Sequence, residues 1–298
     1  MRLDGRIITG KWNKNSYKIV EFLGRGGIGR VYKVLDMKSN SHYALKISED
    51  LQSITKESNM LNKFIYLDII PEVIELDDYE EMGKTYYFII IEYINGENLK
   101  EYILKSRLSL KEIVAVVIII GEMIYNLHKE GYIFGDLKLE NVMIDRKMGE
   151  IKVIDLGGIV PIGASIKEFT PLYDRAKWNM GSRKADTKYD LFSMCMMFVN
   201  LVLRDEKKLL NVEIRHIIKE LRRREINGKL IDLVEKGLYQ KNIDFNNFIF
   251  EVKKMYKTLR IKRKMRYNDR VNLVINTFFI GSTLGFTIIL ILLYRIYL

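Results

Sequence analysis

A glycine-rich loop near the amino terminus limits the folds open to this chain more than any other segment. The loop runs from Gly24 to Gly29 and lies between residues 17–22 and 30–35, two segments with the composition of β-strands. Glycines leave no Cβ atoms in the way, so backbone N–H groups can approach a polyphosphate closely. A strand rather than a helix follows the loop, which argues against a dinucleotide-binding fold. The absence of a GK[ST] sequence in the loop argues against a P-loop.

The remainder of the chain changes from strand patterns to helix patterns. Strand-like segments follow at residues 42–47 and 86–91. Apolar residues at helical spacing predict helices around residues 110–130, 187–204, 207–224 and 229–238. A β-rich part that precedes a helical part predicts an α+β fold.

Several charged and amide side chains lie where such a fold could gather them around a phosphate. One lysine ends an expected strand, and a glutamate lies in the helical segment that follows it. Two further acids, with a lysine and an asparagine between them, lie in two turns, the second of which follows the expected strand 151–154. An acid in a turn is usually a helix cap or a solvated residue, but this ordered set indicates metal and acid–base chemistry. These residues are Lys46, Glu57, Asp136, Lys138, Asn141 and Asp155.

Taken in order, these motifs resemble those of a eukaryotic-type (Hanks-type) Ser/Thr protein kinase of the bacterial kind, over about residues 15–250. The resemblance implies a bilobal fold, with a β-rich amino-terminal lobe and a helical carboxy-terminal lobe. Residues 92–99 resemble the segment that joins the lobes, with Ile91 before it as the gatekeeper. Asp190 resembles the buried aspartate that anchors the catalytic loop of this family.

The resemblance also implies a role for each candidate residue. Asp136 would be the base for the substrate hydroxyl, Lys138 would stabilise the transferred phosphoryl group, and Lys46 paired with Glu57 would hold the phosphates. Asn141 and Asp155 would bind Mg²⁺ or Mn²⁺. Residues implied to bind ATP are Gly24, Arg25, Gly26, Gly27, Ile28, Gly29, Val31, Ala44, Lys46, Glu92, Ile94 and Met143. A lysine at position 138 favours Ser/Thr over Tyr as acceptor.

Several positions depart from the family pattern. Gly135 stands where the family has the arginine that clamps a phosphorylated activation loop, which predicts activity that does not need that phosphate. Phe134 and Leu156 replace the family's His and Phe, and we expect both to remain in apolar surroundings. Lys177 replaces the glutamate of Ala-Pro-Glu. We consider two outcomes: Lys177 pairs with Asp244 in a charge-reversed brace, or it turns to solvent and Phe245 supplies an apolar contact.

The carboxy-terminal end predicts a membrane anchor. Val271 to Tyr294 is 24 residues without a charge, and a helix of that length would span ~36 Å, enough to cross a bilayer core. The basic residues that precede it place the rest of the chain in the cytoplasm by the positive-inside rule. One cysteine, Cys195, indicates a reducing compartment. The predicted divisions are an extension at 1–14, a kinase domain at 15–252, a basic segment at 253–270, a transmembrane helix at 271–294 and an external tail at 295–298.

The charge distribution predicts partners beyond ATP and protein substrates. Residues 253–298 contain ten Lys/Arg and one Asp, so most of the net charge of +11 belongs to this end. The basic segment could serve only to set the membrane topology. Alternatively, it could lie on anionic lipid headgroups or bind DNA. A kinase with such an anchor and no sensor domain resembles a DNA-responsive sporulation kinase of endospore-forming bacteria. A homodimer that phosphorylates itself in trans is a further expectation.

Two alternative functions are weighed against a protein kinase. A small-molecule kinase of the aminoglycoside-phosphotransferase type also has Gly-Asp-Leu before the base, but it resembles the glycine loop and Asp155-Leu156-Gly157 less well. A membrane-tethered pseudokinase that serves as a scaffold would explain the departures at Gly135 and Lys177. Pseudokinases generally lose one of the positions equivalent to Lys46, Asp136 and Asp155, and all three are present here.

Overall fold

The computed structural model describes residues 5–26, 29–146 and 149–258 and divides the chain into two compact units, residues 1–249 and 250–298. In the second unit, residues 250–258 are helical. Among the described residues, no helix is both long enough and apolar enough to cross a membrane. The predicted anchor at 271–294 lies outside the described residues.

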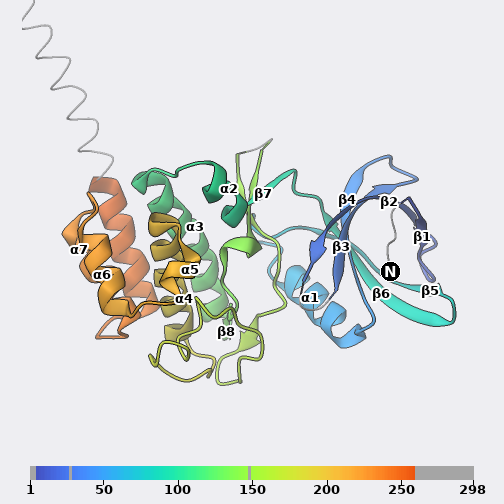
Figure 1. The fold of residues 1–298 in the computed structure, drawn as a ribbon. Helices are drawn as coiled ribbons and strands as arrows, with labels where there is room; N and C mark the ends of the chain where they lie inside the picture. Colours follow the sequence, from blue (N-terminus) through green and yellow to red (C-terminus); the bar gives the residue numbers. More distant parts are fainter. Residues whose placement is uncertain (1–4, 27–28, 147–148, 259–298) are drawn as a thin grey trace, which may run out of the picture. The chain divides into compact units, whose positions relative to one another are not determined.

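A six-stranded antiparallel sheet forms the amino-terminal part of the first unit (Figure 1). The strand order is β1-β2-β3-β4-β6-β5, and β1 belongs to the extension that precedes the predicted domain. The predicted strands before residue 100 are confirmed, but the pattern analysis did not find β5. The bounds are β1 (Ile7–Thr9), β2 (Ser16–Arg25), β3 (Arg30–Asp36), β4 (His42–Ser48), β5 (Val73–Glu81) and β6 (Lys84–Glu92).

One helix, α1 (Leu51–Lys63), packs against strands β4, β5 and β6 of this sheet (Figure 1). Asp50 caps its start, because the Asp50 side chain accepts hydrogen bonds from the backbone N–H groups of Gln52 and Ser53. Ile54 and Leu61 on its inner face are fully buried. Glu57 lies on the same face and is therefore held against the sheet rather than in solvent.

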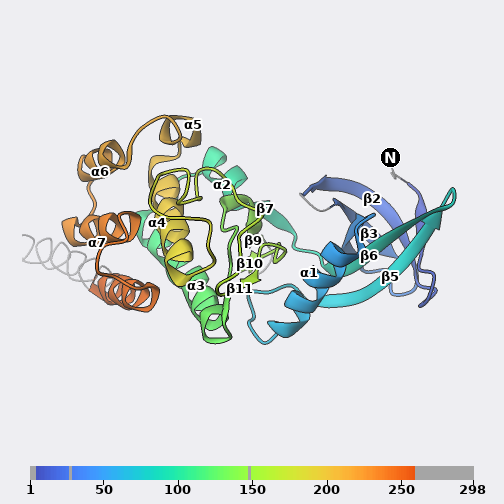
Figure 2. The same cartoon turned by 90° about the horizontal axis from the view of Figure 1, so that it is seen from below.

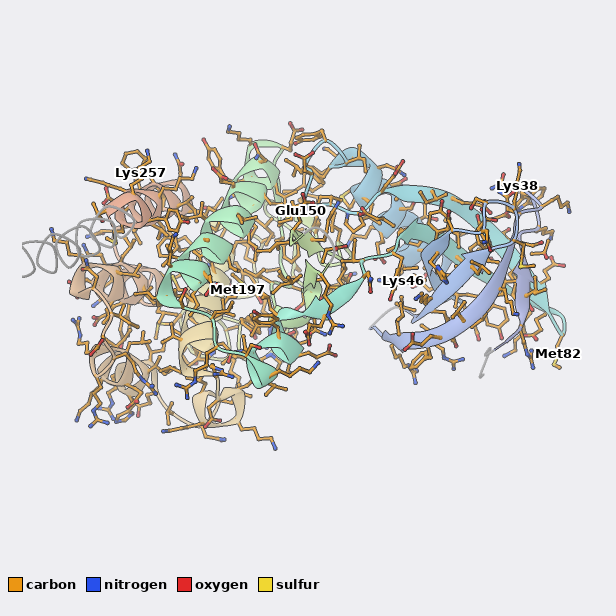
Figure 3. All side chains as sticks on the ribbon, turned by 90° about the horizontal axis from the view of Figure 1, so that it is seen from above. Lys38, Lys46, Met82, Glu150, Met197 and Lys257 are labelled. Carbon is orange, nitrogen blue, oxygen red and sulfur yellow. The ribbon has the colours of Figure 1, made fainter. Side chains whose placement is uncertain are left out.

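The remainder of the first unit is mainly helical (Figure 2), with two small sheets, one of three strands in the order β10-β9-β7 and one that pairs β11 with β8. Helix α4 is its centre and contacts α3, α6 and α7. Almost all of α4 is buried, including Met197 (Figure 3). The helices are α2 (Leu99–Lys105), α3 (Leu110–Lys129), α4 (Thr187–Leu203), α5 (Glu206–Leu209), α6 (Ile214–Arg222) and α7 (Gly228–Leu238); the short strands are β7 (Gly96–Asn98), β8 (Tyr132–Ile133), β9 (Val142–Asp145), β10 (Ile151–Val153) and β11 (Val160–Pro161), with a 3-10 turn η1 (Leu139–Asn141).

The long helix predicted at 207–224 is wrong, because the chain forms two short helices there, α5 and α6. The Asn211 side chain donates to the carbonyl of Lys207, which satisfies a backbone group that a longer helix would have used. Glu213 then takes an extended conformation and begins α6. The other helix predictions are confirmed to within a few residues.

Cys195 is free and fully buried on α4, as the apolar pattern predicts. Helix α7 approaches it closely at Gly237, where an added Cβ atom would lie 2.3 Å from the sulfur. Glycine is therefore needed at this point of the α4–α7 contact, because the packed interior has no room for a methyl group.

Candidate active site

The glycine loop joins β2 to β3, with the backbone N–H of Gly26 bonded to the carbonyl of Gly29 at 2.9 Å. A Cβ atom at Gly29 would lie 2.3 Å from the carbonyl oxygen of Ile47 on β4. Added Cβ atoms at Gly24 and Gly26 would meet nothing within 4 Å. Gly29 is therefore required by the sheet itself, whereas Gly24 and Gly26 border open space. Gly27 and Ile28 lie outside the described residues.

Lys46 on β4, labelled in Figure 3, forms a buried ion pair with Glu57 on α1. The Lys46 Nζ atom is 2.5 Å from Glu57 Oε2 and 3.6 Å from Oδ1 of Asp155. Glu57 has no exposed surface, and Lys46 is 4% exposed. Lys56, one residue before Glu57, donates from Nζ to the carbonyl of Gly157 at 2.6 Å. Helix α1 is thus bound to the turn that carries Asp155, a contact that no motif predicted.

Burial and charge shift the pKa values of this group in different directions. Burial raises the pKa of Glu57 to about 7, and the Lys46 charge only partly offsets that effect. Burial also acts to raise the pKa of Asp155, but the Lys46 charge and the Gly157 N–H outweigh burial, and the pKa is lowered. For Lys46, the charges of Asp155 and Glu57 outweigh burial and raise its pKa. Lys46 therefore stays charged, while Glu57 can gain a proton near neutral pH.

Asp190, in the first turn of α4, holds the loop between β8 and η1 in place. The Asp190 carboxylate accepts the backbone N–H of Phe134 at 2.8 Å and that of Gly135 at 3.0 Å. The His128 Nε2 atom is 2.8 Å from the same carboxylate. Asp190 has no exposed surface, so these contacts replace its hydration. The predicted anchoring role of Asp190 is confirmed by this geometry.

Asp136, directly after Gly135, is almost fully buried and has two side-chain contacts. The Lys138 ammonium pairs with one carboxylate oxygen, and the Thr170 hydroxyl donates to the other at 3.0 Å. The Asn141 amide donates to the Asp136 carbonyl at 3.1 Å. The structure therefore brings Asp136, Lys138, Asn141 and Thr170 together.

This group lies beside the Lys46 group, since the backbone N–H of Ile154, next to Asp155, donates to the carbonyl of Asn141 at 3.0 Å, and the Lys138 charge also lowers the pKa of Asp155. Magnesium in phosphate-transfer sites is usually held by one or two side-chain oxygens together with phosphates and water. Asn141 donates from its amide nitrogen to the Asp136 carbonyl, and Asp155 contacts the Gly157 N–H and Lys46 through Oδ1, so each side chain retains an oxygen for a metal ion. The described residues contain no cluster of three or more His, Cys, Asp or Glu that could bind a metal without such help.

The residues expected around the adenine lie on the facing strands and on the segment after them. Val31 on β3 pairs with Lys46, and Ala44 pairs with Ile91 across β4 and β6. Ile94 is buried just beyond β6. The two other residues of the expected set are Glu92, whose carboxylate is 3.1 Å from Lys152 Nζ, and Met143 on β9.

Comparison with known proteins decides the family. The family model for the protein kinase domain matches residues 17–265. The chain belongs to the protein kinase family. It is 37% identical over 241 residues to the serine/threonine-protein kinase YabT of Bacillus subtilis, a match that covers 79% of this chain and 69% of that protein.

Two further relatives are also described as serine/threonine kinases. The chain is 29% identical to the serine/threonine-protein kinase PrkC of Bacillus subtilis, over 51% of this chain and 24% of that protein. It is 29% identical to a probable serine/threonine-protein kinase, an MRK1 homolog of Encephalitozoon cuniculi, over 63% of this chain and 60% of that protein. The kinase thus belongs to the bacterial Ser/Thr group, a family that uses ATP and a divalent metal ion.

The departure at Gly135 has a structural cause in this kinase. Gly135 has φ +80°, and an added Cβ atom would lie 2.6 Å from the carbonyl oxygen of Gly158. A side chain therefore cannot occupy this position without moving the backbone. Phe134 and Leu156 are both buried, as expected for the residues that replace the family's His and Phe.

The predicted charge-reversed pair between Lys177 and Asp244 does not form, so this prediction is wrong. Lys177 is exposed and donates from Nζ to the carbonyl of Leu210 at 3.4 Å. The Asp244 carboxylate instead accepts the backbone N–H of Asn247 at 2.8 Å. Phe245 is buried against the ring of His128, with ring centroids 4.6 Å apart. Phe245 thus packs on the residue that supports Asp190.

Arg175 instead braces the loop between residues 174 and 186, a contact that no motif predicted. Its guanidinium makes two parallel bonds of 2.7 Å to the Asp186 carboxylate, and it is 4% exposed. It also donates to the carbonyls of Ser182 and Lys184 and to the Gln240 side chain. Gln240 lies in the segment where the family's arginine was expected. The brace in the structure joins Arg175 to Asp186, and neither residue belongs to the predicted pair.

A second ion pair joins Asp174, the residue before Arg175, to Arg183, so the two pairs cross along the sequence. Asp174 has no exposed surface, and it accepts bonds from Arg183 Nε and Nη2 at 3.0 and 2.8 Å. The Arg183 guanidinium lies 3.7 Å from the ring centroid of Phe169, next to Thr170. The two crossed pairs close the loop between residues 174 and 186 and support the residue that binds Asp136.

Protonation of Glu57 should lower activity in mildly acidic solution. A protonated Glu57 cannot hold Lys46 by charge, so kcat/KM for ATP should fall about tenfold from pH 8 to pH 6. Stability should change in the opposite sense, because the folded-state pKa lies above the unfolded value: the contribution of this group is complete below about pH 4.5 and is lost as pH rises through 7. The Glu57→Gln variant should be less active at pH 8, with a flatter profile. Equal slopes for the two proteins would contradict this role for Glu57.

Removal of Arg175 should destabilise the protein far more than a change at Lys177. Arg175→Ala removes the bonds to the partly exposed Asp186 and to two backbone carbonyls, at a cost of about 2–3 kcal/mol in unfolding free energy. Arg175→Lys keeps the charge but loses the two parallel bonds, so an intermediate loss is expected. Lys177→Glu, on the exposed side of the same segment, should change the free energy by about 0.5 kcal/mol or less. Urea unfolding of the three variants measures these differences, and similar losses at positions 175 and 177 would rule out the brace.

Proposed function

We propose that this protein transfers the terminal phosphoryl group of ATP to Ser and Thr hydroxyls of cytoplasmic proteins and of its own chain. The observation that carries the proposal is that the Lys46–Glu57–Asp155 group and the Asp136–Lys138–Asn141 group face the same site. Phosphoryl transfer needs little covalent chemistry from a protein, so positioning and charge account for most of the catalysis.

Each side chain then has one task. Asp136 accepts the proton of the substrate hydroxyl, and the Thr170 hydroxyl and Lys138 ammonium fix the orientation of its carboxylate. Lys46, held by Glu57, binds the phosphates. Asn141 and Asp155 would hold the magnesium ion, which neutralises the charge on the phosphates when it is bound. Lys138 also stabilises the charge that develops on the transferred group.

We also propose that the chain is anchored in the cell membrane by residues 271–294, with the kinase domain in the cytoplasm. The support is the 24-residue charge-free stretch and the basic residues between 253 and 270 that precede it. We favour anionic lipid headgroups as the partner of this basic segment, since it lies next to the proposed anchor. DNA binding and a homodimer remain proposals that a gel shift and a mass measurement in detergent test directly.

The test of the activity is magnesium-dependent phosphorylation by the full chain. The wild-type protein should label itself and a generic protein substrate on Ser and Thr, and Asp136→Asn should reduce the rate at least about 100-fold. Lys46→Met and Asp155→Ala should also lose turnover while their circular dichroism spectra remain unchanged. Nucleotide binding without turnover in the wild type would identify a pseudokinase, and transfer to an aminoglycoside alone would identify a small-molecule kinase.

Activity should not depend on phosphorylation of the activation segment. Ser165 and Thr170 are the hydroxyl residues between Gly158 and Pro171, and Ser165 is exposed. Ser165→Ala should leave the initial rate within about threefold of the wild type. Thr170→Ala should lower it about tenfold or more, because Asp136 loses a hydrogen bond of 3.0 Å, and Thr170→Ser should restore most of it. A large loss from Ser165→Ala would show that a phosphate is needed at that position.

A further inference from the structure

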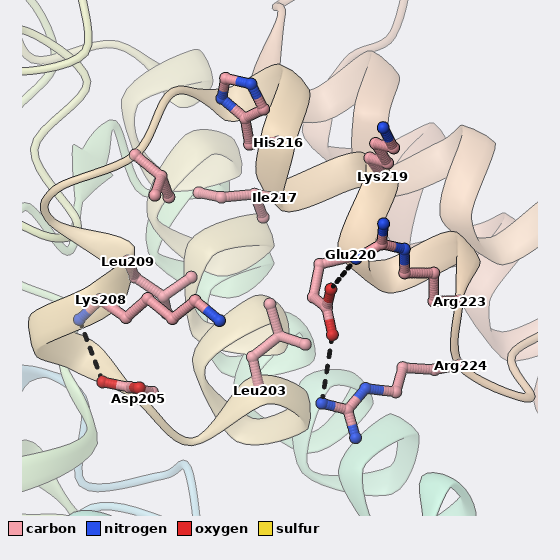
Figure 4. A pocket seen from close by; sticks show the side chains of 11 residues that line it. Leu203, Asp205, Lys208, Leu209, His216, Ile217, Lys219, Glu220, Arg223 and Arg224 are labelled. Carbon is pink, nitrogen blue, oxygen red and sulfur yellow. Dashed lines mark hydrogen bonds and ion pairs between the residues drawn. The ribbon is translucent and has the colours of Figure 1, made fainter.

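Two neighbouring pockets form a continuous groove in the helical part of the first unit, which we name the α5–α6 groove. The first has a volume of about 540 Å³ between the end of α4, helix α5 and helix α6 (Figure 4). The second, about 590 Å³, extends the groove to α2 and the start of α3. Both pockets are lined by Leu203, Asp205 and Arg224, which makes the groove continuous.

The groove has a strong excess of positive charge. Six cationic side chains line it, against two carboxylates, Asp205 and Glu220. Both carboxylates are already engaged: Asp205 accepts the backbone N–H of Lys208, and Glu220 pairs with two arginines (Figure 4). The cationic residues are Arg107, Arg204, Lys208, Lys219, Arg223 and Arg224.

Three of these cations, Arg107, Lys208 and Lys219, have neither an ion pair nor a side-chain hydrogen bond within the described parts of the chain. All three are exposed at the edge of the groove. Uncompensated cations around a cavity favour an anionic ligand, both in affinity and in the rate of association.

The wall between the cations is apolar. Leu203, Leu209 and Ile217 line the first pocket, and Leu104, which is 74% exposed, lines the second. Apolar side chains among the cations allow the groove to hold an apolar side chain of a ligand as well as its charges. The lining contains no Phe, Tyr or Trp on which a base could stack, and it includes two carboxylates, so a peptide suits the groove better than a nucleic acid.

The groove is physically connected to the site of phosphoryl transfer. Leu210, directly after α5, accepts the bond from Lys177 in the activation segment. Glu206, the first residue of α5, pairs with Lys100 at 2.9 Å, and Lys100 also binds Glu140 at 2.6 Å, the residue before Asn141. A protein bound in the groove is therefore close to the activation segment and to the catalytic loop, where the acceptor hydroxyl would lie.

We propose that the α5–α6 groove binds an acidic segment of the protein substrate, separate from the phosphorylated residue. An apolar side chain of that segment fills the cavity against Leu203 and Leu209, and its carboxylates pair with Lys208 and Lys219. The proposal rests on the proposed kinase function and specifies its substrates: proteins in which an acceptor Ser or Thr is accompanied by an acidic segment with an apolar residue.

The test uses the full chain and two-part peptides. Each peptide joins one generic acceptor sequence, through a flexible Gly/Ser linker, to a segment with a central Leu and zero, two or four flanking Asp residues. The KM should fall about tenfold or more from zero to four Asp, while kcat stays constant, because docking raises the local concentration of the acceptor. A fluorescein-labelled segment without the acceptor measures binding independently of turnover.

Matched variants assign the effect to the groove. Lys208→Glu with Lys219→Glu should remove the dependence of KM on Asp and leave phosphorylation of the zero-Asp peptide unchanged. Lys229→Glu with Lys236→Glu makes the same change in charge on exposed positions of α7 that do not line the groove, and it should retain the dependence.

The outcomes separate the two proposals. A KM that does not vary with Asp, or that varies equally in the groove variant, overturns the groove proposal and leaves the kinase function intact. Binding of the labelled segment without any phosphorylation supports the groove as a peptide site and contradicts the kinase function. A DNA duplex that binds through Lys208 and Lys219, together with no binding of the acidic segment, also overturns the proposal.

Discussion

The fully buried carboxylate of Asp190 is the interaction on which the geometry of the active site depends. A lone carboxylate in this interior would be unstable, so it must keep its donors: two successive backbone N–H groups and the ring of His128. Those donors fix the backbone at Phe134 and Gly135, and therefore the position of Asp136. Helix α4, which carries Asp190, is itself buried on nearly all sides, so the catalytic loop is attached to the packed interior.

The activation segment is held by fixed charges. On one side Thr170 binds Asp136, and on the other side the crossed pairs Asp174–Arg183 and Arg175–Asp186 close the following loop. A buried ion pair stabilises a fold only when its donors and acceptors are satisfied, and Arg175 meets that condition with bonds to a carboxylate, two carbonyls and an amide. Charged residues of the chain itself therefore hold this segment in place.

The motif residues could be predicted because phosphoryl transfer admits few side chains and a fixed order along the chain. Lys46, Glu57, Asp136 and Asp155 were found in this way, and the structure places them at one site. The brace at Arg175 was missed because nothing in local spacing pairs it with Asp186, and the family pattern directed attention to Lys177. The break between α5 and α6 depends on one asparagine side chain, which a helical pattern does not reveal. The α5–α6 groove is lined by residues from five helices or their flanking loops, so it has no sequence signature.

The contact between Gly135 and Gly158 limits how this kinase can evolve. A single codon change at 135 that introduced an arginine would bring its Cβ atom into the Gly158 carbonyl before any phosphate could be bound. Gain of control by activation-loop phosphorylation therefore requires a rearranged backbone at 158 together with the new side chain.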